Sequence, residues 1–301
     1  MFNYIDYRKV EKPLSLKNFT VEIGFGGGDY IVSLAKERKD EVFFGIEKSW
    51  IPVNKLLNKC KKEDIKNIYC TKIDAYWAFQ LLFEDCSVKE IIMNYPDPWP
   101  KKSHEDKRLT STENLHIYAK KLIHGGTIRV RTDDYLLVDY TLRECEKTGA
   151  FDSEVIKPVI KEPITKYEKK WLSIGKSIWD LILTKNKDPF PLKIRQIKEV
   201  RELYPIRISL ENINTESLIN REFKIENNLY IKIFSAWRKN EDFAIEVLLS
   251  ENGFLQSFLV TIKKRDSYYI INISKFSEVL KTEGIKKALL FLSKVLEEKK
   301  I

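Results

Sequence analysis

Five apolar runs, each followed by a helical segment, dominate the first part of the chain and restrict the folds it can adopt. Within the segments between the runs, apolar residues recur at the spacing of an amphipathic helix. Parallel strands need a crossover, usually a helix, so these units predict a mostly parallel, doubly wound α/β sheet with helices on both faces. The runs read NFTVEIGF, EVFFGIE, NIYCTKI, KEIIMNY and GTIRVRT, and the helical segments span residues 29–38, 51–61, 76–83, 112–123 and 135–147.

The pattern changes after about residue 185, where a polar stretch with prolines is typical of a linker. Before it, two more strands are expected, at residues 151–156 and in SIWDLILTK. Beyond it, alternating runs joined by hairpin turns and a closing amphipathic helix predict a small α+β domain. These runs read NLYIKIFSAWR, EDFAIEVLLS, FLQSFLVTIKK and SYYIINIS. We therefore expect two domains, residues 1–188 and 189–301.

Glycines follow the first expected strand in the sequence VEIGFGGGD. There they permit a tight turn and a close approach of the backbone to a ligand, which makes Gly24 and Gly26 candidate cofactor-binding positions. The dinucleotide fingerprint needs glycine or alanine where Asp29 stands, and the carboxylate of Glu22 would repel a pyrophosphate. These departures favour a cationic ligand, S-adenosylmethionine, over NAD. The alternative is a tight turn that binds nothing.

Carboxylates stand at or near the ends of several expected strands. Glu47 follows the glycines at the distance typical of a residue that accepts hydrogen bonds from ribose hydroxyls, although a surface charge is the alternative. Asp74 either reaches the adenine edge or caps the helix that follows it. Ligands of such sheets bind at the carboxyl ends of the strands, so we expect Glu22, Glu47, Asp74 and Asp97 around one crevice.

The fourth expected strand runs into the proline-rich sequence NYPDPWP, followed at once by the basic run KKSHEDKR. Prolines restrict the backbone, so this loop should hold Asp97 and Trp99 in fixed positions. Trp99 either stacks on a ligand or packs in the core, and core packing is favoured. The basic run is expected to contact phosphates beside the crevice, the alternative being a solvated charged face.

The charge of the chain favours a polyanionic partner, because 53 Lys and Arg residues against 44 Asp and Glu give a net charge of +9. The four cysteines form no C-x-x-C pair and the three histidines are scattered, so no metal site is expected. No apolar run approaches a membrane span, and the N-terminus lacks the apolar segment of a signal peptide. We expect a cytoplasmic protein with no membrane partner, and no partner protein is evident.

Together, the glycine segment and the proline-rich loop resemble those of the bacterial tRNA (guanine-N7-)-methyltransferase family. The similarity extends from about residue 20 to residue 184. Its most specific parts are the Pro-Asp-Pro-Trp-x-Lys-Lys block and the sequence Thr-Lys-Tyr-Glu. The matching stretches are EIGFGGG, FFGIEKS, the position of Asp74, NYPDPWPKKSHEDKRL, RVRTDD and ITKYE.

The resemblance implies a class I methyltransferase fold and methylation of guanine N7, usually in the variable loop of tRNA. It implies S-adenosylmethionine as the cofactor and tRNA as the partner. Asp97 corresponds to the catalytic position. By motif position, the cofactor residues are Glu22, Glu47, Asp74 and Asp97, and the substrate-binding residues are Lys101, Asp133, Thr165 and Glu168.

Two departures from the family pattern are visible. Ser103, Asp106 and Lys107 stand where the family often has arginine or another basic residue, and a lysine cannot form the bidentate phosphate fork of an arginine. The segment after about residue 190 has no counterpart in the short family members and resembles an extension found in some heat-adapted ones. It would either bind RNA or stabilise the enzyme.

Guanine N7 carries an in-plane lone pair and no proton, so its methylation requires positioning rather than a general base. Asp97 would either hold the N1–H and N2–H edge of the guanine or stabilise the charge that develops on it. Two other functions remain open for the same sequence. They are a nucleic-acid amine methyltransferase on the same fold and a non-catalytic RNA-binding protein.

Overall fold

The structure is a computed structural model, and it describes residues 3–99, 101–157, 173, 175–209, 213 and 215–298. The chain divides into two compact units, Met1–Lys193 and Ile194–Ile301, each of which is described by itself. Phe190 still belongs to the first unit. Its N–H donates to the carbonyl of Thr148 at 2.9 Å, and its ring fills the space where a Cβ on Gly149 would lie.

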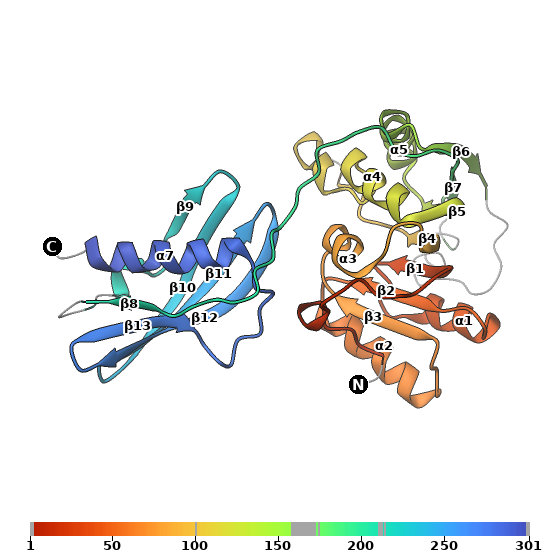
Figure 1. Cartoon of the computed structure of the whole chain (residues 1–301). Coiled ribbons are helices and arrows are strands. Elements are labelled where there is room, and N and C mark those ends of the chain that lie inside the picture. Colours follow the sequence, from red (N-terminus) through yellow and green to blue (C-terminus); the bar gives the residue numbers. More distant parts are fainter. Residues whose placement is uncertain are drawn as a thin grey trace. The chain divides into compact units, whose positions relative to one another are not determined.

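The first unit is built on a seven-stranded sheet in the order β3-β2-β1-β4-β5-β7-β6 (Figure 1). The first five of its strands are parallel, while β7 runs antiparallel to both β5 and β6. This arrangement confirms the expected mostly parallel sheet. The strands are β1 (Phe19–Ile23), β2 (Phe43–Glu47), β3 (Ile68–Lys72), β4 (Val88–Asn94), β5 (Leu122–Thr132), β6 (Phe151–Ile156) and β7 (Trp179–Lys185).

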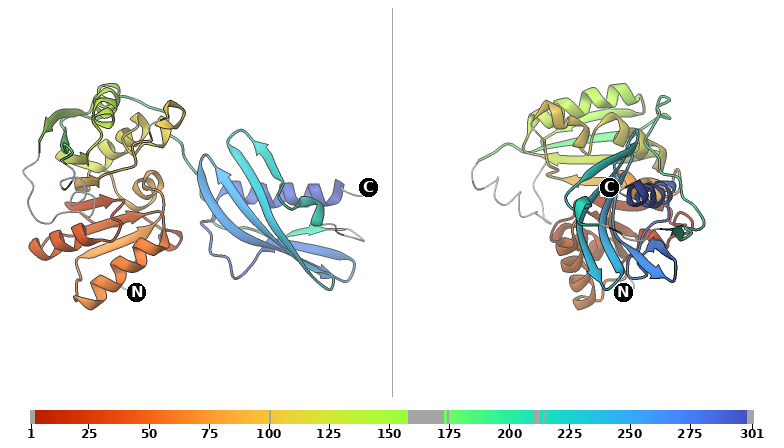
Figure 2. Two further views of the ribbon diagram at one scale, coloured as in Figure 1. Left: turned by 180° about the vertical axis from the view of Figure 1, so that it is seen from behind. Right: turned by 90° about the vertical axis from the view of Figure 1, so that its left-hand side faces the viewer.

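Helices connect the parallel strands and cover both faces of the sheet, α1 and α2 on one and α3, α4 and α5 on the other (Figures 1 and 2). All five expected strand–helix units are confirmed. The helices are α1 (Asp29–Glu37), α2 (Trp50–Lys62), α3 (Ala75–Leu82), α4 (Thr112–Lys121) and α5 (Tyr135–Thr148), with short 3-10 helices η1 (Tyr7–Lys9) and η2 (Lys102–Lys107).

The sheet core follows from the apolar character of the strands on both faces. Every residue of β1 is buried, and so are all but the last of β2. A sheet covered by helices on both faces requires such runs, because neither face of its strands meets water. Buried side chains of α1 and α2 complete one core layer with Phe43, Ile68 and Ile92.

One boundary differs from the expectation. We expected α4 to continue to Ile123 and the next strand to start at Gly126, but β5 begins at Leu122. The β4–β5 ladder is irregular there, since Val88 pairs with Leu122 and Glu90 with Thr127. The additional residues of β5 between these two pairs are irregular, and Gly125 among them has a φ of 76°.

The second unit is a six-stranded antiparallel sheet in the order β8-β13-β12-β11-β10-β9, with helix α7 (Glu283–Glu298) packed on one face. This confirms the expected α+β class. The four expected strands, the hairpin turns at 251–253 and 265–267 and the closing helix are all present. The strands are β8 (Ile206–Ile208), β9 (Glu222–Glu226), β10 (Leu229–Lys239), β11 (Asp242–Glu251), β12 (Phe254–Arg265) and β13 (Tyr268–Ile273), and η3 is Glu216–Leu218. The edge strands β8 and β9 were not expected.

Candidate active site

A cavity of about 850 Å³ opens at the carboxyl ends of β1, β2 and β4. This is the edge where open α/β sheets bind their ligands. Five of the residues predicted as site residues line it together, and further side chains around it come from α1, α2, the start of α3 and the segment after β4. The five are Glu22, Gly24, Gly26, Glu47 and Asp97.

The glycine loop leaves its backbone open toward the cavity. Gly24 and Gly26 have φ values of 72° and 52°, in the region that side chains rarely adopt, and a Cβ built on either one would meet no atom within 4 Å. Lys59 on α2 holds the loop, because its Nζ donates to the carbonyl of Gly27 at 2.8 Å and pairs with Asp29. The loop is therefore held in place while its open side can receive a ligand.

Glu47 ends β2 and is fixed by two backbone amides. Its Oε1 accepts from the N–H of Gly26 and its Oε2 from the N–H of Lys48, each at 3.0 Å. A carboxylate oxygen has two lone pairs, so both oxygens keep the capacity to accept from hydroxyl groups. This geometry fits the expected role of accepting hydrogen bonds from a ribose.

Glu22 is buried, at 3% exposure, at the end of β1. Its Oε1 accepts from Asn94 Nδ2 at 2.9 Å, but its Oε2 makes no hydrogen bond of standard geometry with the described residues. Burial raises the pKa of Glu22 to about 7, against the lowering effects of the Asn94 amide and the Arg129 guanidinium. Removal from water disfavours the charged form, and a cation in the cavity would restore it.

Asp74 is the helix cap of α3. Its Oδ1 accepts from the N–H of Tyr76 at 2.9 Å, and its Oδ2 lies 2.5 Å from Lys48 Nζ. Its neighbours Ile73 and Ala75 line the cavity, whereas Asp74 is not among the lining residues. Of the two roles left open by the sequence, the structure shows the cap.

The loop after β4 carries Asp97 to the mouth of the cavity, where it is exposed. Tyr95 and Trp99 have φ values of 53° and 41°, which cost on the order of 1–3 kcal/mol each for residues with a side chain. The loop is tied to the sheet at its start, since Tyr95 N–H donates to the carbonyl of Arg131 at 2.7 Å. Such strain persists only where the surroundings hold the backbone in place.

Trp99 does not pack in the core, so the favoured expectation was wrong. The side chain is half-buried and lines the cavity. Its ring stands edge-on to His104, with centroids 5.6 Å apart, and Lys107 Nζ lies 5.2 Å from the ring centroid. Trp99 has a positive φ, and the sequence pattern gives no sign of it.

The residues expected to bind substrate are less closely grouped. Lys101 is exposed at the start of η2, and Asp133 follows β5 with its Oδ2 2.6 Å from Lys176 Nζ. Neither is among the residues that line the cavity. Thr165 and Glu168 lie outside the described residues.

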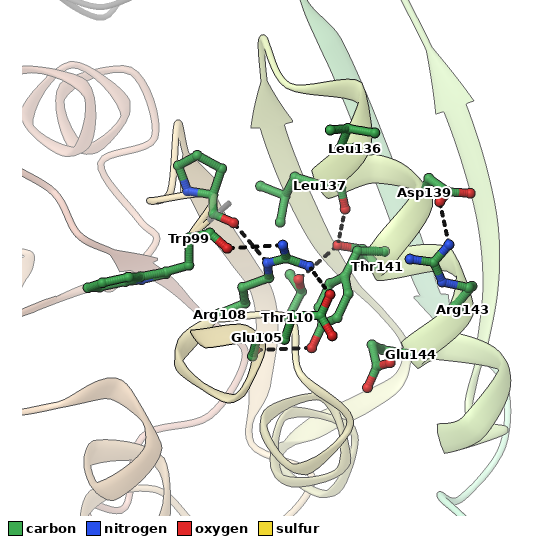
Figure 3. Close-up of polar contacts among 12 residues, drawn as sticks. Trp99, Glu105, Arg108, Thr110, Leu136, Leu137, Asp139, Thr141, Arg143 and Glu144 are labelled. Carbon is green, nitrogen blue, oxygen red and sulfur yellow. Dashed lines mark hydrogen bonds and ion pairs between the residues drawn. The ribbon is translucent and has the colours of Figure 1, made fainter. Parts of the chain in front are cut away.

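The basic run is not uniformly exposed, and its contact with phosphates stays a prediction for its exposed residues. Lys101 and Lys107 face solvent, but Arg108 is only 7% exposed. Its guanidinium points inward at the proline-rich loop (Figure 3). The run alone does not predict the burial of Arg108, because most of its partners lie in the loop before the run and on α5.

Sequence reasoning also missed the lysines that α2 contributes. Lys55 and Lys59 line the cavity together with Pro52 and with Lys48, which precedes the helix. Their spacing of three and four residues along α2 places them on one face, and that periodicity was the available signal. They add positive charge to the lining of the cavity.

Among the described residues, no helix is long and apolar enough to cross a membrane. The same residues contain no group of three or more histidine, cysteine, aspartate or glutamate side chains placed to hold a metal ion.

Comparison with known proteins places the chain in a family. Residues 17–181 match a family model described as "Putative methyltransferase". The chain is 44% identical to the tRNA (guanine-N(7)-)-methyltransferase of Aquifex aeolicus, over 98% of this chain and 100% of that protein. It is 29% identical to the protein of the same name from Thermotoga maritima, over 88% of this chain and 85% of that protein.

A shorter relative of the same name, from Mycoplasmopsis pulmonis, is 34% identical over 54% of this chain and 82% of its own length. Among solved structures, an rRNA methylase from Streptococcus thermophilus aligns with 60% of this chain and 92% of its own at a TM-score of 0.40 and 13% identity. That similarity is too weak to support an argument. The sequence relatives are sufficient, and the chain belongs to the tRNA (guanine-N(7)-)-methyltransferase family.

Proposed function

We propose that this protein transfers a methyl group from S-adenosylmethionine to N7 of a guanine in the variable loop of tRNA, giving 7-methylguanine. One observation carries the proposal. A carboxylate on a strained, proline-rich loop, Asp97, borders the same cavity as the open glycine loop and the strand-end carboxylates Glu22 and Glu47. The family to which the chain belongs is named for this activity.

The residues of the cavity fit S-adenosylmethionine. The backbone of Gly24 and Gly26 is open on the cavity side, and Glu47 keeps lone pairs for ribose hydroxyls. Two buried polar atoms beside the cavity, Glu22 Oε2 and Asn94 Oδ1, have no standard hydrogen bond with the described residues. Glu22 would supply negative charge toward the cationic donor.

When bound, S-adenosylmethionine supplies an electrophilic methyl group on a sulfonium. The chain's own residues have to bring guanine N7 into line with it, because N7 has a free lone pair and needs no deprotonation. Asp97 would either accept hydrogen bonds from the N1–H and N2–H edge of the base or stabilise the positive charge that develops on the base. The base must leave its stack to reach the cavity, so we infer a flipped or splayed guanine.

The tRNA backbone would meet the exposed lysines beside the cavity. Lys101 and Lys107 are both exposed, and lysine contacts with phosphates supply affinity that does not depend on base sequence. Asp133, Thr165 and Glu168 are the further residues that we propose for substrate binding. Family position supports these three assignments.

Product analysis tests the proposal directly. The full-length protein is incubated with labelled S-adenosylmethionine and unmodified tRNA, and the tRNA is digested to nucleosides. We expect labelled 7-methylguanosine, with the modified position mapped by chemical cleavage and reverse transcription. Labelled N6-methyladenosine would indicate an amine methyltransferase instead, and the absence of S-adenosylmethionine binding heat would indicate a non-catalytic RNA-binding protein.

We further propose that the second domain, expected at residues 189–301 and forming a compact unit from Ile194, is separable, which the shorter relative supports because it matches only 54% of this chain. Deleting residues 191–301 keeps Phe190, which packs against Gly149. Lower tRNA affinity of the truncated protein would assign RNA binding to this domain. A lower melting temperature with unchanged affinity would assign it a stabilising role.

A further inference from the structure

Arg108 lies immediately after η2 and is turned into the protein. Its Nε donates to the carbonyl of Pro98 at 2.8 Å and its Nη2 to the carbonyl of Trp99 at 3.0 Å (Figure 3). Its Nη1 lies 3.4 Å from Glu105 Oε1. The two carbonyls belong to the residues that directly follow Asp97, so the guanidinium holds the backbone of the proline-rich loop.

Helix α5 supports this guanidinium from the other side. The Arg108 Cζ lies 4.1 Å from the ring centroid of Tyr140, and the Tyr140 hydroxyl donates to the carbonyl of Glu105 at 3.1 Å. The hydroxyls of Thr110 and Thr141 are 2.8 Å apart, which ties the next part of the chain to the same helix (Figure 3). The loop is thereby attached, through Arg108, to an element of the core.

The backbone carbonyls of the proline-rich loop need hydrogen-bond donors from outside the loop. Its prolines have no N–H and cannot bond the loop's own carbonyls, and Trp99 sits at a φ of 41°. A guanidinium presents two donors in a fixed planar fork, which matches two successive carbonyls as a lysine ammonium cannot. Stacking on the Tyr140 ring also orients the plane of that fork.

We propose that Arg108 is a positioning residue for methyl transfer. By fixing the Pro98 and Trp99 carbonyls against Tyr140, it aims Asp97 into the cavity. This inference rests on the proposed function. It differs from the role of phosphate contact that the basic run predicts, and it leaves the exposed Lys101 and Lys107 for the RNA backbone.

The first test separates positioning from RNA binding with Arg108→Lys, which keeps the charge and loses the fork. In the full-length protein we expect the single-turnover methyl-transfer rate at saturating tRNA to fall about 100-fold, the usual effect of misplacing a reacting group by about 1 Å. The tRNA Kd and its salt slope should stay within about twofold of wild type. Lys101→Gln should instead reduce the salt slope by about one. Arg143→Lys, an exposed arginine of α5, serves as the matched control and should leave the rate unchanged.

The second test uses Arg108→Ala and chemical rescue. Added methylguanidinium at about 10 mM should restore part of the lost rate, whereas ethylammonium at equal ionic strength should not, because only the former presents the planar fork. The fraction of folded protein is measured for every variant by the stoichiometry of S-adenosylmethionine binding in calorimetry. Tyr140→Leu should slow methyl transfer, and combining it with Arg108→Ala should slow it little further.

Three results would overturn the inference. The first is an Arg108→Lys variant whose methyl-transfer rate at saturating tRNA is unchanged and whose salt slope of tRNA binding is reduced by about one. The second is equal rescue of Arg108→Ala by methylguanidinium and ethylammonium. The third is that the effects of the Arg108 and Tyr140 substitutions on the rate are additive. Wild-type protein that makes no 7-methylguanosine would instead contradict the proposed function itself.

Discussion

Two carboxylates border the cavity from adjacent strands, and they are controlled in opposite ways. Glu22 is buried at the end of β1, and burial raises its pKa to about 7. Asp97 is exposed after β4, and a strained backbone clamped by Arg108 fixes its position. The protein thus sets the charge of one acid through its surroundings and the direction of the other through its main chain.

The largest effect is expected at the exposed acid. Asp97→Ala should lower the single-turnover rate by about 100-fold or more, in the range found for removal of a group that stabilises a transition state. Asp139→Asn, an exposed acid on α5, is the control and should have no effect. Asp97→Asn sharpens the comparison, because it retains a hydrogen-bond acceptor. A rate well above that of Asp97→Ala would favour orientation of the base, and an equal rate would favour charge stabilisation.

Substitution of the buried acid should affect binding and stability in opposite directions. Glu22→Gln removes the charge that faces a cationic donor, so calorimetry should show S-adenosylmethionine binding weakened by about 10-fold to 100-fold, as for loss of a hydrogen bond to a charged group. The same change removes a buried ionisable group, so the ligand-free protein should melt at a higher temperature at pH 8. Glu154→Gln on the exposed β6 should change neither quantity. A variant with lower stability and unchanged affinity would contradict this account.

The pH dependence follows from the raised pKa of Glu22, about 7 against a usual value of 4.5. The folded state holds the proton more tightly than the unfolded state, so the stability contributed by Glu22 is complete below pH 4.5. It is lost as the pH rises through 7, by on the order of 3 kcal/mol in the ligand-free protein. Denaturant unfolding at pH 5 and pH 8 measures the change, with Glu22→Gln as the reference that accounts for the other titrating groups. A wild-type curve parallel to that of the variant would show that Glu22 does not titrate in this range.

The smallest effect is expected in the glycine loop. Gly26→Ala should cost about 1–2 kcal/mol of stability, because its φ of 52° is unfavourable for a residue with a Cβ. Its methyl group would also extend toward the cavity and weaken binding of S-adenosylmethionine. Gly27→Ala is the matched comparison, since Gly27 has no positive φ and its Cβ would meet the flexible ends of two side chains, Asp29 at 3.2 Å and Lys59 at 4.0 Å. Equal losses for the two variants would argue against the backbone explanation.

Much of the fold could be predicted because it is recorded in local patterns. The strand–helix units of the first domain and the four long strands of the second have strong apolar periodicity. The short edge strands β8 and β9 are harder to predict. Ile206–Ile208 has only three residues, too few to show a period, and it pairs with β13. Glu222–Glu226 does alternate charged and apolar residues, but the pattern is only five residues long; it pairs with β10 at the edge of the sheet.

The site could be predicted where candidate residues stand at the ends of expected strands, because the carboxyl ends of parallel strands meet at one edge of the sheet. That rule identified Glu22, Glu47 and Asp97, which all line the cavity. It could not foresee that Arg108 turns inward while Lys107 turns outward, because both belong to one basic run. The difference arises from Tyr140, on a helix that only the folded chain brings near.

Two residues of the proline-rich loop with left-handed backbone, Tyr95 and Trp99, limit how this protein could be engineered for long storage. A screen for heat resistance would be expected to favour changes that relax this loop, since relief of the strained torsions is the most direct local gain available there. Each such stabilising substitution would reduce the restraint on the position of Asp97. At these positions, a longer storage life should therefore come with a lower methyl-transfer rate. Stabilising substitutions are better sought in the second domain.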